Sequence, residues 1–229
     1  MPKLDQQAPK QSPWGTVQDA IKLADGAWSV STPSHGGIKL SAKLNAGIPD
    51  YMRREDGWYE EDCDWCIPVM VYPEFALAMT WTSPAGTHGG WTVEQILNNA
   101  KDTLRNWHPE SYARFYGVPI ESLRGQSYKY DQRCFAEEQA NNLVSVVAWG
   151  DWHKNVPEGM VGIGATLGGD RAACATVEYF LVPKERYTFP YVVRQDDLPW
   201  CGPDGEATAL SQSYIPGTKQ ANDYLRANP

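Results

Sequence analysis

The 229-residue chain has no cluster of lysines and arginines, and its 28 acidic residues outnumber its 20 basic ones, for a formal net charge of −8. Binding to a nucleic-acid backbone depends on clustered positive charge, so the sequence argues against nucleic acid as a direct partner. The negative charge is compatible with a basic protein partner, and equally with a solvated surface that has no partner.

Long apolar runs are also missing: none approaches the roughly 18 residues that span a bilayer. The start of the chain, MPKLDQQAPKQSP, lacks the charged and then apolar pattern of a signal peptide. The five cysteines are an odd number without regular spacing, which is typical of reduced thiols. We therefore expect a cytoplasmic protein that does not bind a membrane.

The chain is rich in aromatic residues, with ten Trp and twelve Tyr. A hydrophobic content of 42% is that of a folded protein, and it excludes a disordered one. Indole and phenol rings bury a large area and keep a polar group, so they serve both in cores and as anchors of protein interfaces.

The first half of the chain predicts a hairpin and several helices. The apolar spacing in WGTVQDAIKLADG (14–26) favours a short helix that ends at Gly26, while AWSVST and IKLSA predict two strands joined by the turn PSHGG. Thr92 and Gln95 form a capping-box pattern before a helix that ends at His108-Pro109. A shorter helix follows and stops at Gly117.

The last third is different, because NLVSVVAWGDW, GMVGIGATLGG, CATVEYFLVP and FPYVVRQ are β-rich runs separated by turn residues. They predict an antiparallel meander. We expect an α+β fold in which an N-terminal hairpin and helices pack with this C-terminal antiparallel sheet. Residues 14–203 form one domain in this prediction, after a flexible arm (1–13) and before a polar tail (204–229).

A Cys-x-x-Cys pair lies in GWYEEDCDWC, at Cys63 and Cys66. A structural zinc site needs four ligands, usually two such pairs, and the other cysteines are isolated. A reactive thiol needs a lowered pKa, whereas the carboxylates of Asp62 and Asp64 raise it. We therefore predict neither a metal nor a cofactor.

Two similar turns, Ser34-His35-Gly36-Gly37 and Thr87-His88-Gly89-Gly90, each place a histidine before two glycines. One interpretation is purely structural, with the glycines supplying positive φ. The alternative is a catalytic set of His35, Asp62, Cys63 and His88, in which His35 acts as the base for the Cys63 thiol or pairs with Asp62 or Glu61 in acid–base hydrolysis.

Carboxylates and rings are concentrated around residue 60. Oxygen ligands for Mg²⁺ or Ca²⁺ are present, but the spacing of an EF-hand is absent. Acidic residues at the start of a helix are a second explanation. The third is a contact surface for an Arg- or Lys-rich groove of a partner. The residues of this predicted partner-binding surface are Glu55, Asp56, Trp58, Tyr59, Glu60, Glu61, Asp64 and Trp65.

The segments STPSHGGIKLS, GWYEEDCDW, GMVGIGAT and YFLVP resemble an uncharacterised family of proteins from bacteriophages, conjugative plasmids and other mobile elements. The resemblance covers roughly residues 14 to 200, and it implies no catalytic residue. It implies a context, the host cytosol, in which such proteins often act on host machinery, including restriction and CRISPR complexes.

Three hypotheses follow. The first is a non-enzymatic mobile-element protein that binds a host protein, such as a defence nuclease complex with a basic nucleic-acid-binding groove, and inhibits it. The second is a hydrolase or transferase with a His/Cys/carboxylate site. The third is a structural or packaging component that self-assembles. The sequence leaves the oligomeric state open.

Overall fold

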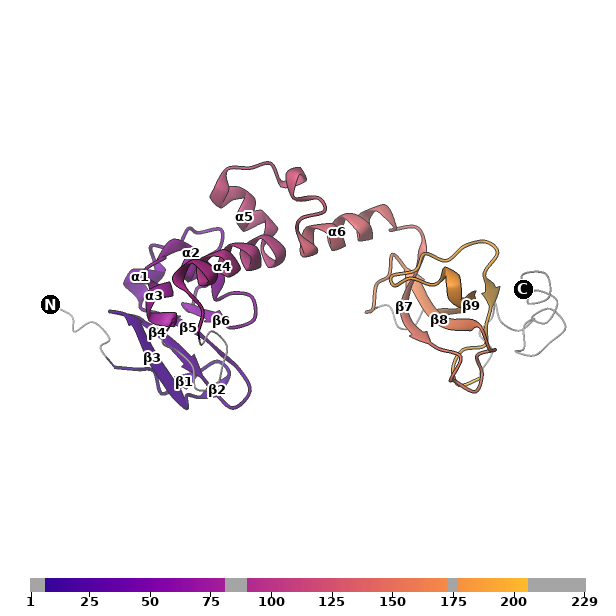
Figure 1. Ribbon diagram of the computed structural model, residues 1–229, viewed down its shortest axis with the longest axis horizontal. Helices are drawn as coiled ribbons and strands as arrows, with labels where there is room; N and C mark the ends of the chain where they lie inside the picture. Colours follow the sequence, from indigo (N-terminus) through magenta and orange to yellow (C-terminus); the bar gives the residue numbers. More distant parts are fainter. Residues whose placement is uncertain (1–6, 81–89, 173–176, 206–229) are drawn as a thin grey trace. The chain divides into compact units, whose positions relative to one another are not determined.

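The computed structural model describes residues 7–80, 90–172 and 177–205, and these divide into two compact units, Met1–Asp131 and Gln132–Pro229 (Figure 1). The α+β class is confirmed, because helices and antiparallel strands are both present. The division into two units differs from the single domain expected over residues 14–203. Its physical reason is that each unit buries its own hydrophobic core.

The N-terminal unit is built on a four-stranded antiparallel sheet in the order β3-β4-β5-β6. Its strands are β3 (Asp19–Ala24), β4 (Ala27–Ser31), β5 (Gly36–Leu40) and β6 (Trp58–Glu60). The predicted hairpin is confirmed, since β4 pairs with β5 from Ala27↔Leu40 to Ser31↔Gly36.

The helix predicted over residues 14–26 is wrong. This segment contains β2 (Gly15–Thr16) and β3 instead. Of the residues that suggested a helix, Leu23 is buried and Ile21 is 39% exposed, so there is no helical stripe to bury. Backbone pairing with β4 decides the structure, and Gly26, at φ +84°, forms the turn between the strands.

The predicted flexible arm also requires a correction. Within residues 1–13, the part from Gln7 is described, and β1 (Gln11–Ser12) pairs with β2. Ser12 closes this small hairpin, because its Oγ donates to the Gly15 carbonyl at 2.9 Å. At the other end of the chain, residues 206–229 of the predicted tail lie outside the described residues.

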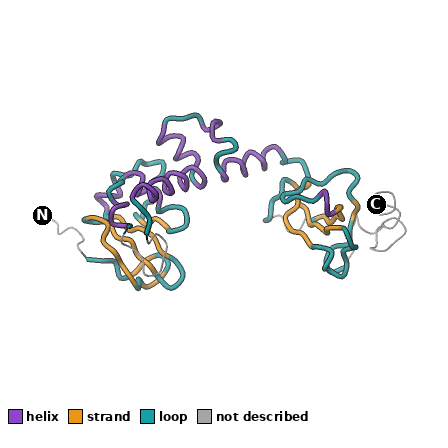
Figure 2. Tube along the Cα trace, in the orientation of Figure 1, coloured by secondary structure: helices purple, strands orange, loops and turns teal. Residues whose placement is uncertain are grey.

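Helices cover one face of the N-terminal sheet (Figures 1 and 2). They are α1 (Ala42–Asn45), α2 (Cys66–Val71), α3 (Phe75–Met79) and α4 (Val93–Trp107), while α5 (Pro109–Tyr116) packs against α4. The core joins side chains from both layers, such as Ile38 and Tyr59 from the sheet with Phe75 and Ile96 from the helices. The helices predicted after the hairpin are thus present, and the sheet on which this layer packs is the N-terminal one.

Local signals for two of these helices are confirmed. Thr92 and Gln95 exchange the two hydrogen bonds of a capping box at the start of α4. Gly117 ends α5 in the left-handed conformation, at φ +64°. A short 3₁₀ turn, η1 (Ile120–Leu123), and a helix that the sequence did not predict, α6 (Tyr128–Glu138), follow. The boundary between the units falls inside α6.

The C-terminal unit is the antiparallel sheet that the sequence predicted, in the order β10-β9-β8-β7. Its elements are β7 (Leu143–Trp149), β8 (Met160–Leu167), β9 (Glu178–Pro183), the 3₁₀ turn η3 (Lys184–Arg186) and β10 (Leu198–Pro199). Trp200 is fully buried, and a Cβ at Gly162 would overlap its ring, so this glycine makes room for the indole.

FPYVVRQ is not a regular strand, contrary to the prediction. It lies along β7, where Ser145 N donates to Tyr191 O at 2.8 Å and Val193 N donates to Leu143 O at 2.9 Å. The Tyr191 amide, however, donates to the Ser145 side chain. This hydrogen bond to a side chain takes the place of a backbone–backbone hydrogen bond of a regular antiparallel pair. Val144 and Val192 form an isolated bridge.

Candidate functional site

The Ser-His-Gly-Gly turn and the acidic segment lie side by side, because β5 and β6 are neighbouring strands. Gly37 pairs with Glu60, and the Glu61 amide donates to the Gly36 carbonyl at 3.1 Å. The two glycines permit this approach. A Cβ at Gly36 would overlap the Glu61 carboxylate, and one at Gly37 would overlap the Tyr59 carbonyl and the ring of Trp14. Close approach therefore explains these glycines, and positive φ does not.

The register brings His35, Glu60 and Glu61 together. Each offers a ligand atom, and the three atoms lie within 4.8 Å of one another. His35 and Glu61 are exposed, while Glu60 is half-buried. These three residues are called the His35 cluster below.

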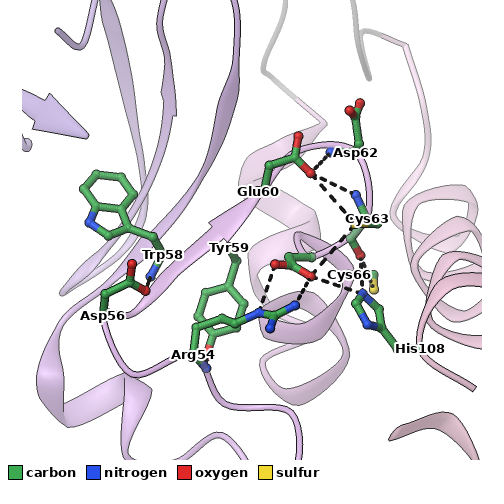
Figure 3. Close-up of polar contacts among 10 residues, drawn as sticks. Arg54, Asp56, Trp58, Tyr59, Glu60, Asp62, Cys63, Cys66 and His108 are labelled. Atoms are coloured by element: carbon green, nitrogen blue, oxygen red, sulfur yellow. Dashed lines mark hydrogen bonds and ion pairs between the residues drawn. The ribbon is translucent and has the colours of Figure 1, made fainter. Parts of the chain in front are cut away.

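Glu60 is held in place by the turn that follows it. One carboxylate oxygen, Oε2, accepts hydrogen bonds from the amides of Asp62 at 2.8 Å and Cys63 at 3.3 Å (Figure 3). The other oxygen, Oε1, is buried and has no hydrogen-bond partner. A buried carboxylate oxygen without a partner is costly and uncommon in folded proteins.

Negative charge is crowded at the His35 cluster. Burial raises the pKa of Glu61 above its ordinary value, and the carboxylates of Glu60 and Asp62 add to the rise. A hydrogen bond from Gly36 and the nearby His35 oppose it without cancelling it. The site thus stabilises the protonated form of Glu61, and it would gain from a bound positive charge.

A second group of polar side chains lies on the other side of the same turn. The Arg54 guanidinium donates to both oxygens of Asp64, at 2.6 and 3.0 Å. His108 Nε2 lies 3.2 Å from Asp64 Oδ1 and 3.1 Å from the Cys63 carbonyl (Figure 3). Cys63 Sγ is 4.0 Å from the same Asp64 oxygen. We call Arg54, Cys63, Asp64 and His108 the Asp64 cluster.

Sequence reasoning missed Arg54 and His108. His108 was noted only as the residue that ends a helix before Pro109, and it indeed caps α4. No local pattern connects it with residue 64, since the contact depends on how α4 packs against the β6 segment. Arg54 lies directly before Glu55, the first residue of the predicted partner-binding surface, but its basic charge alone did not indicate which carboxylate it binds.

Asp64 depends on its partners for its charge. Burial by itself would raise its pKa, yet the hydrogen bonds from His108 and Arg54 outweigh burial and hold the pKa below the ordinary aspartate value. A lowered carboxyl pKa stabilises the fold above the ordinary pKa, and this contribution is lost as the pH falls through the lowered pKa.

We therefore expect Asp64→Asn to reduce the free energy of unfolding by about 1–2 kcal/mol at pH 7. The difference from the unaltered chain should shrink as the pH falls from the ordinary aspartate pKa of about 4 through the lowered pKa of Asp64, where the folded carboxylate becomes protonated. Urea unfolding of both chains over a series of pH values measures this. Asp62→Asn, an exposed carboxylate on the same turn, is the matched control, with an expected change below about 0.5 kcal/mol. A difference that does not decrease at all between pH 7 and the lowest pH at which both chains remain folded would contradict the assignment.

The Cys-x-x-Cys pair forms no disulfide, and the surroundings of its two thiols disfavour the thiolate. Cys63 and Cys66 are both free, and the Cys66 thiol donates to the Cys63 carbonyl at 3.1 Å. Burial raises the pKa of both thiols. At Cys63 the carboxylates of Asp64 and Glu60 raise it further, and Arg54 only partly compensates. Asp62 and Asp64 thus both raise the pKa of the Cys63 thiol, as the sequence predicted.

Alkylation tests this electrostatic environment. At pH 7.5, iodoacetamide should modify Cys63 of the folded chain more slowly than Cys63 of the urea-unfolded chain, because a raised pKa reduces the thiolate fraction. Peptide mass spectrometry gives both rates on the same residue. Equal or faster modification in the folded state would show an activated thiolate and would restore the nucleophile hypothesis.

The predicted catalytic set is only partly assembled. His35 meets Glu60 and Glu61, whereas Cys63 meets Asp64 and His108. The two clusters touch through Glu60, whose Oε2 lies 3.9 Å from Cys63 Sγ. The Asp62 side chain is exposed beside them. His88 lies outside the described residues.

The predicted partner-binding surface needs correction at its rings. Tyr59 and Trp65 are buried in the core, so they are not available to a partner. Trp58 is half-buried, packs edge-on against Trp14 and lies under the Lys39 ammonium. Side chains alternate between the two faces of a strand, and Tyr59 lies on the inward face of β6. This alternation explains why the prediction of an exposed Tyr59 is wrong.

The acidic members of that surface divide into two groups. Glu60 and Asp64 are half-buried and hydrogen-bonded within the turn. The exposed ones are Glu55, Asp56 and Glu61, with Asp62 next to them. Among the described residues, none of these four exposed carboxylates forms an ion pair.

Residues 7–140 match the family model DUF7007, a domain of unknown function. The chain belongs to this family. The DUF7007 region contains both clusters and all described strands and helices of the N-terminal unit. No curated protein and no solved structure matches the chain. Across the described residues, no helix of the DUF7007 protein has the length and apolar character needed to cross a membrane.

Proposed function

We propose that this DUF7007 protein is a binding protein that engages a basic surface of a partner protein through exposed carboxylates beside β6. The observation that carries the proposal is the exposure of Glu55, Asp56, Glu61 and Asp62 without ion pairs among the described residues. A chain with a net charge of −8 attracts a basic partner over a distance and accelerates encounter.

The partner that this charge fits is a nucleic-acid-binding groove lined by Lys and Arg. Acidic side chains can occupy such a groove in place of phosphates. We propose a host protein as the partner and a defence nuclease complex, of the restriction or CRISPR kind, as its class. This finer proposal is supported by the acidity of the chain and by the resemblance of its motifs to proteins of mobile elements.

The test combines binding and inhibition. Purified restriction and CRISPR nuclease complexes are incubated with the full chain, and both complex formation and DNA cleavage are measured at 50 and at about 300 mM salt, since screening weakens exposed pairs. The altered chain carries Glu55→Gln, Asp56→Asn and Asp62→Asn, which leave both clusters intact. The matched control neutralises three exposed carboxylates of the C-terminal unit, Glu158, Glu185 and Asp204.

The expected result is salt-sensitive binding that the first triple variant loses and the control retains. Equal loss of binding in both triple variants would indicate that binding depends on the net charge of the chain and not on a specific surface. Absence of binding to every nuclease complex at low salt would overturn the finer proposal. Binding to another basic host protein with the same dependence on the three residues would support only the general one.

A hydrolase or transferase is the second candidate. Its specific support is the His35–Glu61 juxtaposition, which is one of the acid–base pairs expected from the sequence, together with the raised pKa of Glu61. Nitrophenyl ester and phosphoester substrates provide a first assay. Loss of turnover in both His35→Ala and Glu61→Gln, with retention in Asp62→Asn, is the expected result of this candidate, and turnover that survives both substitutions would exclude it.

A further inference from the structure

We infer that the His35 cluster binds a divalent transition-metal cation of the zinc class, through the His35 imidazole and the carboxylates of Glu60 and Glu61. This inference goes beyond the proposed partner binding, and either can fail without the other. It contradicts the expectation from the sequence, in which no metal was predicted because zinc-finger and EF-hand spacings are absent.

Geometry is the first support. The three ligand atoms lie within 4.8 Å of one another, which is a separation that a cation at bonding distance from each can bridge. They lie at the adjoining ends of two strands, with His35 directly before β5, Glu60 at the end of β6 and Glu61 directly after it, and backbone hydrogen bonds fix the register, including Glu61 N to Gly36 O at 3.1 Å. The ligands are thus positioned by the sheet, and Gly36 leaves the space that the Glu61 carboxylate occupies.

The second support is independent of this proximity. Glu60 Oε1 is buried and lacks a hydrogen-bond partner, although Oε2 of the same carboxylate accepts two amides. A metal ion bound to Oε1 would satisfy the remaining oxygen while the amides continue to orient the ligand. The same ion would offset the repulsion between the neighbouring carboxylates of Glu60 and Glu61.

The donor set selects the class of metal. One imidazole and two carboxylates suit Zn²⁺ and its first-row neighbours, whereas Mg²⁺ and Ca²⁺ prefer oxygen alone. Since His35 and Glu61 are exposed, an ion has access from solvent, and water can occupy the remaining position.

The Asp64 cluster is the competing location, since Cys63, Asp64 and His108 also offer atoms within 4.8 Å. There, however, Arg54 already donates to both Asp64 oxygens, and His108 Nε2 bonds the Cys63 carbonyl. A cation at that point would have to displace a charged partner or lie beside it. The Arg54 guanidinium thus already supplies a positive charge at the Asp64 cluster. Among the described residues, no such guanidinium lies at the His35 cluster.

Titration of the metal-free full chain with Zn²⁺, followed by calorimetry, tests the inference, and Co²⁺ absorbance in the visible range reports the ligand environment. We expect one saturable site per chain. His35→Ala and Glu60→Gln should each weaken Zn²⁺ binding by about tenfold or more. Asp62→Asn is the matched carboxylate control, and His108→Gln is the control for the competing cluster. Both should bind with unchanged affinity, and circular dichroism verifies that each variant is folded.

Three results would overturn the inference: no saturable Zn²⁺ binding, binding that survives His35→Ala, or binding that His108→Gln abolishes. The last would place the metal at the Asp64 cluster. None of these results bears on the triple variant used to test partner binding, because Glu55, Asp56 and Asp62 are not ligands in either cluster.

Discussion

Replacement of Tyr59 by Ala is expected to lower the free energy of unfolding of the N-terminal unit by about 3–5 kcal/mol, the range for removing a large buried aromatic ring. Tyr59 is fully buried and lies in the core between the sheet and the helices. Its hydroxyl donates to Asn45 Oδ1 at 2.7 Å and accepts the Arg54 amide at 3.2 Å. The Tyr59 side chain therefore helps to hold the loop that precedes β6 against α1, together with the Asn45 side chain, which donates to the Arg54 carbonyl at 2.7 Å.

Tyr59→Phe separates the ring from the hydroxyl. It retains the packing and leaves the Asn45 oxygen and the Arg54 amide without their partner, so we expect a loss of about 1–3 kcal/mol. Hydrogen exchange of the β4–β6 amides in the full chain reports this unit without interference from the other one. If Tyr59→Ala and Tyr59→Phe gave equal losses, the ring would not be part of the core.

Substitution of Gly36 by Ala is expected to have the second-largest effect, because it alters both stability and the His35 cluster. The added Cβ would overlap the Glu61 carboxylate and the Val30 carbonyl. The Val30 carbonyl is part of the backbone of β4 and cannot move easily, so the β6 segment must move away. We expect this to lower the free energy of unfolding by about 1–3 kcal/mol. Affinity for Zn²⁺ should fall by about tenfold or more, because Glu61 no longer reaches the position beside His35.

Ser34→Ala is the control for Gly36→Ala, since Ser34 is exposed on the same turn and lies outside the cluster. It should change neither the stability nor the affinity. Unchanged Zn²⁺ affinity in a folded Gly36→Ala chain would mean that the space at residue 36 does not position Glu61.

Local signals predicted the elements whose structure is decided locally. The capping box at Thr92, the stop at Gly117 and the hairpin of β4 and β5 all depend on nearby residues, and all three are confirmed. The segment 14–26 failed because its pairing with β4 outweighs a short apolar spacing that also fits a helix. Helix α6 was missed since none of its residues is buried, and so no apolar stripe marks it.

The site was predictable to the extent that it follows from the sheet. The sequence indicated that His35 and the acidic segment would meet if the protein has a site, and adjacent strands bring them together. It did not indicate the roles of Arg54, in the loop before β6, and of His108, at the end of α4, because no local pattern connects either residue with Asp64. It also placed Tyr59 and Trp65 on the surface, because composition alone reveals neither which face of β6 is buried nor that the start of α2, where Trp65 lies, enters the core.

The most direct test of the account is a crystal structure of the full chain grown with Zn²⁺, with anomalous diffraction data collected on both sides of the zinc absorption edge. We expect one strong anomalous peak bonded to His35, Glu60 and Glu61, with Glu60 Oε1 as a ligand and with Arg54 still bound to Asp64. A structure of the zinc-saturated chain with no peak at the His35 cluster, or with the metal bound by Cys63, Asp64 and His108 instead, would contradict it.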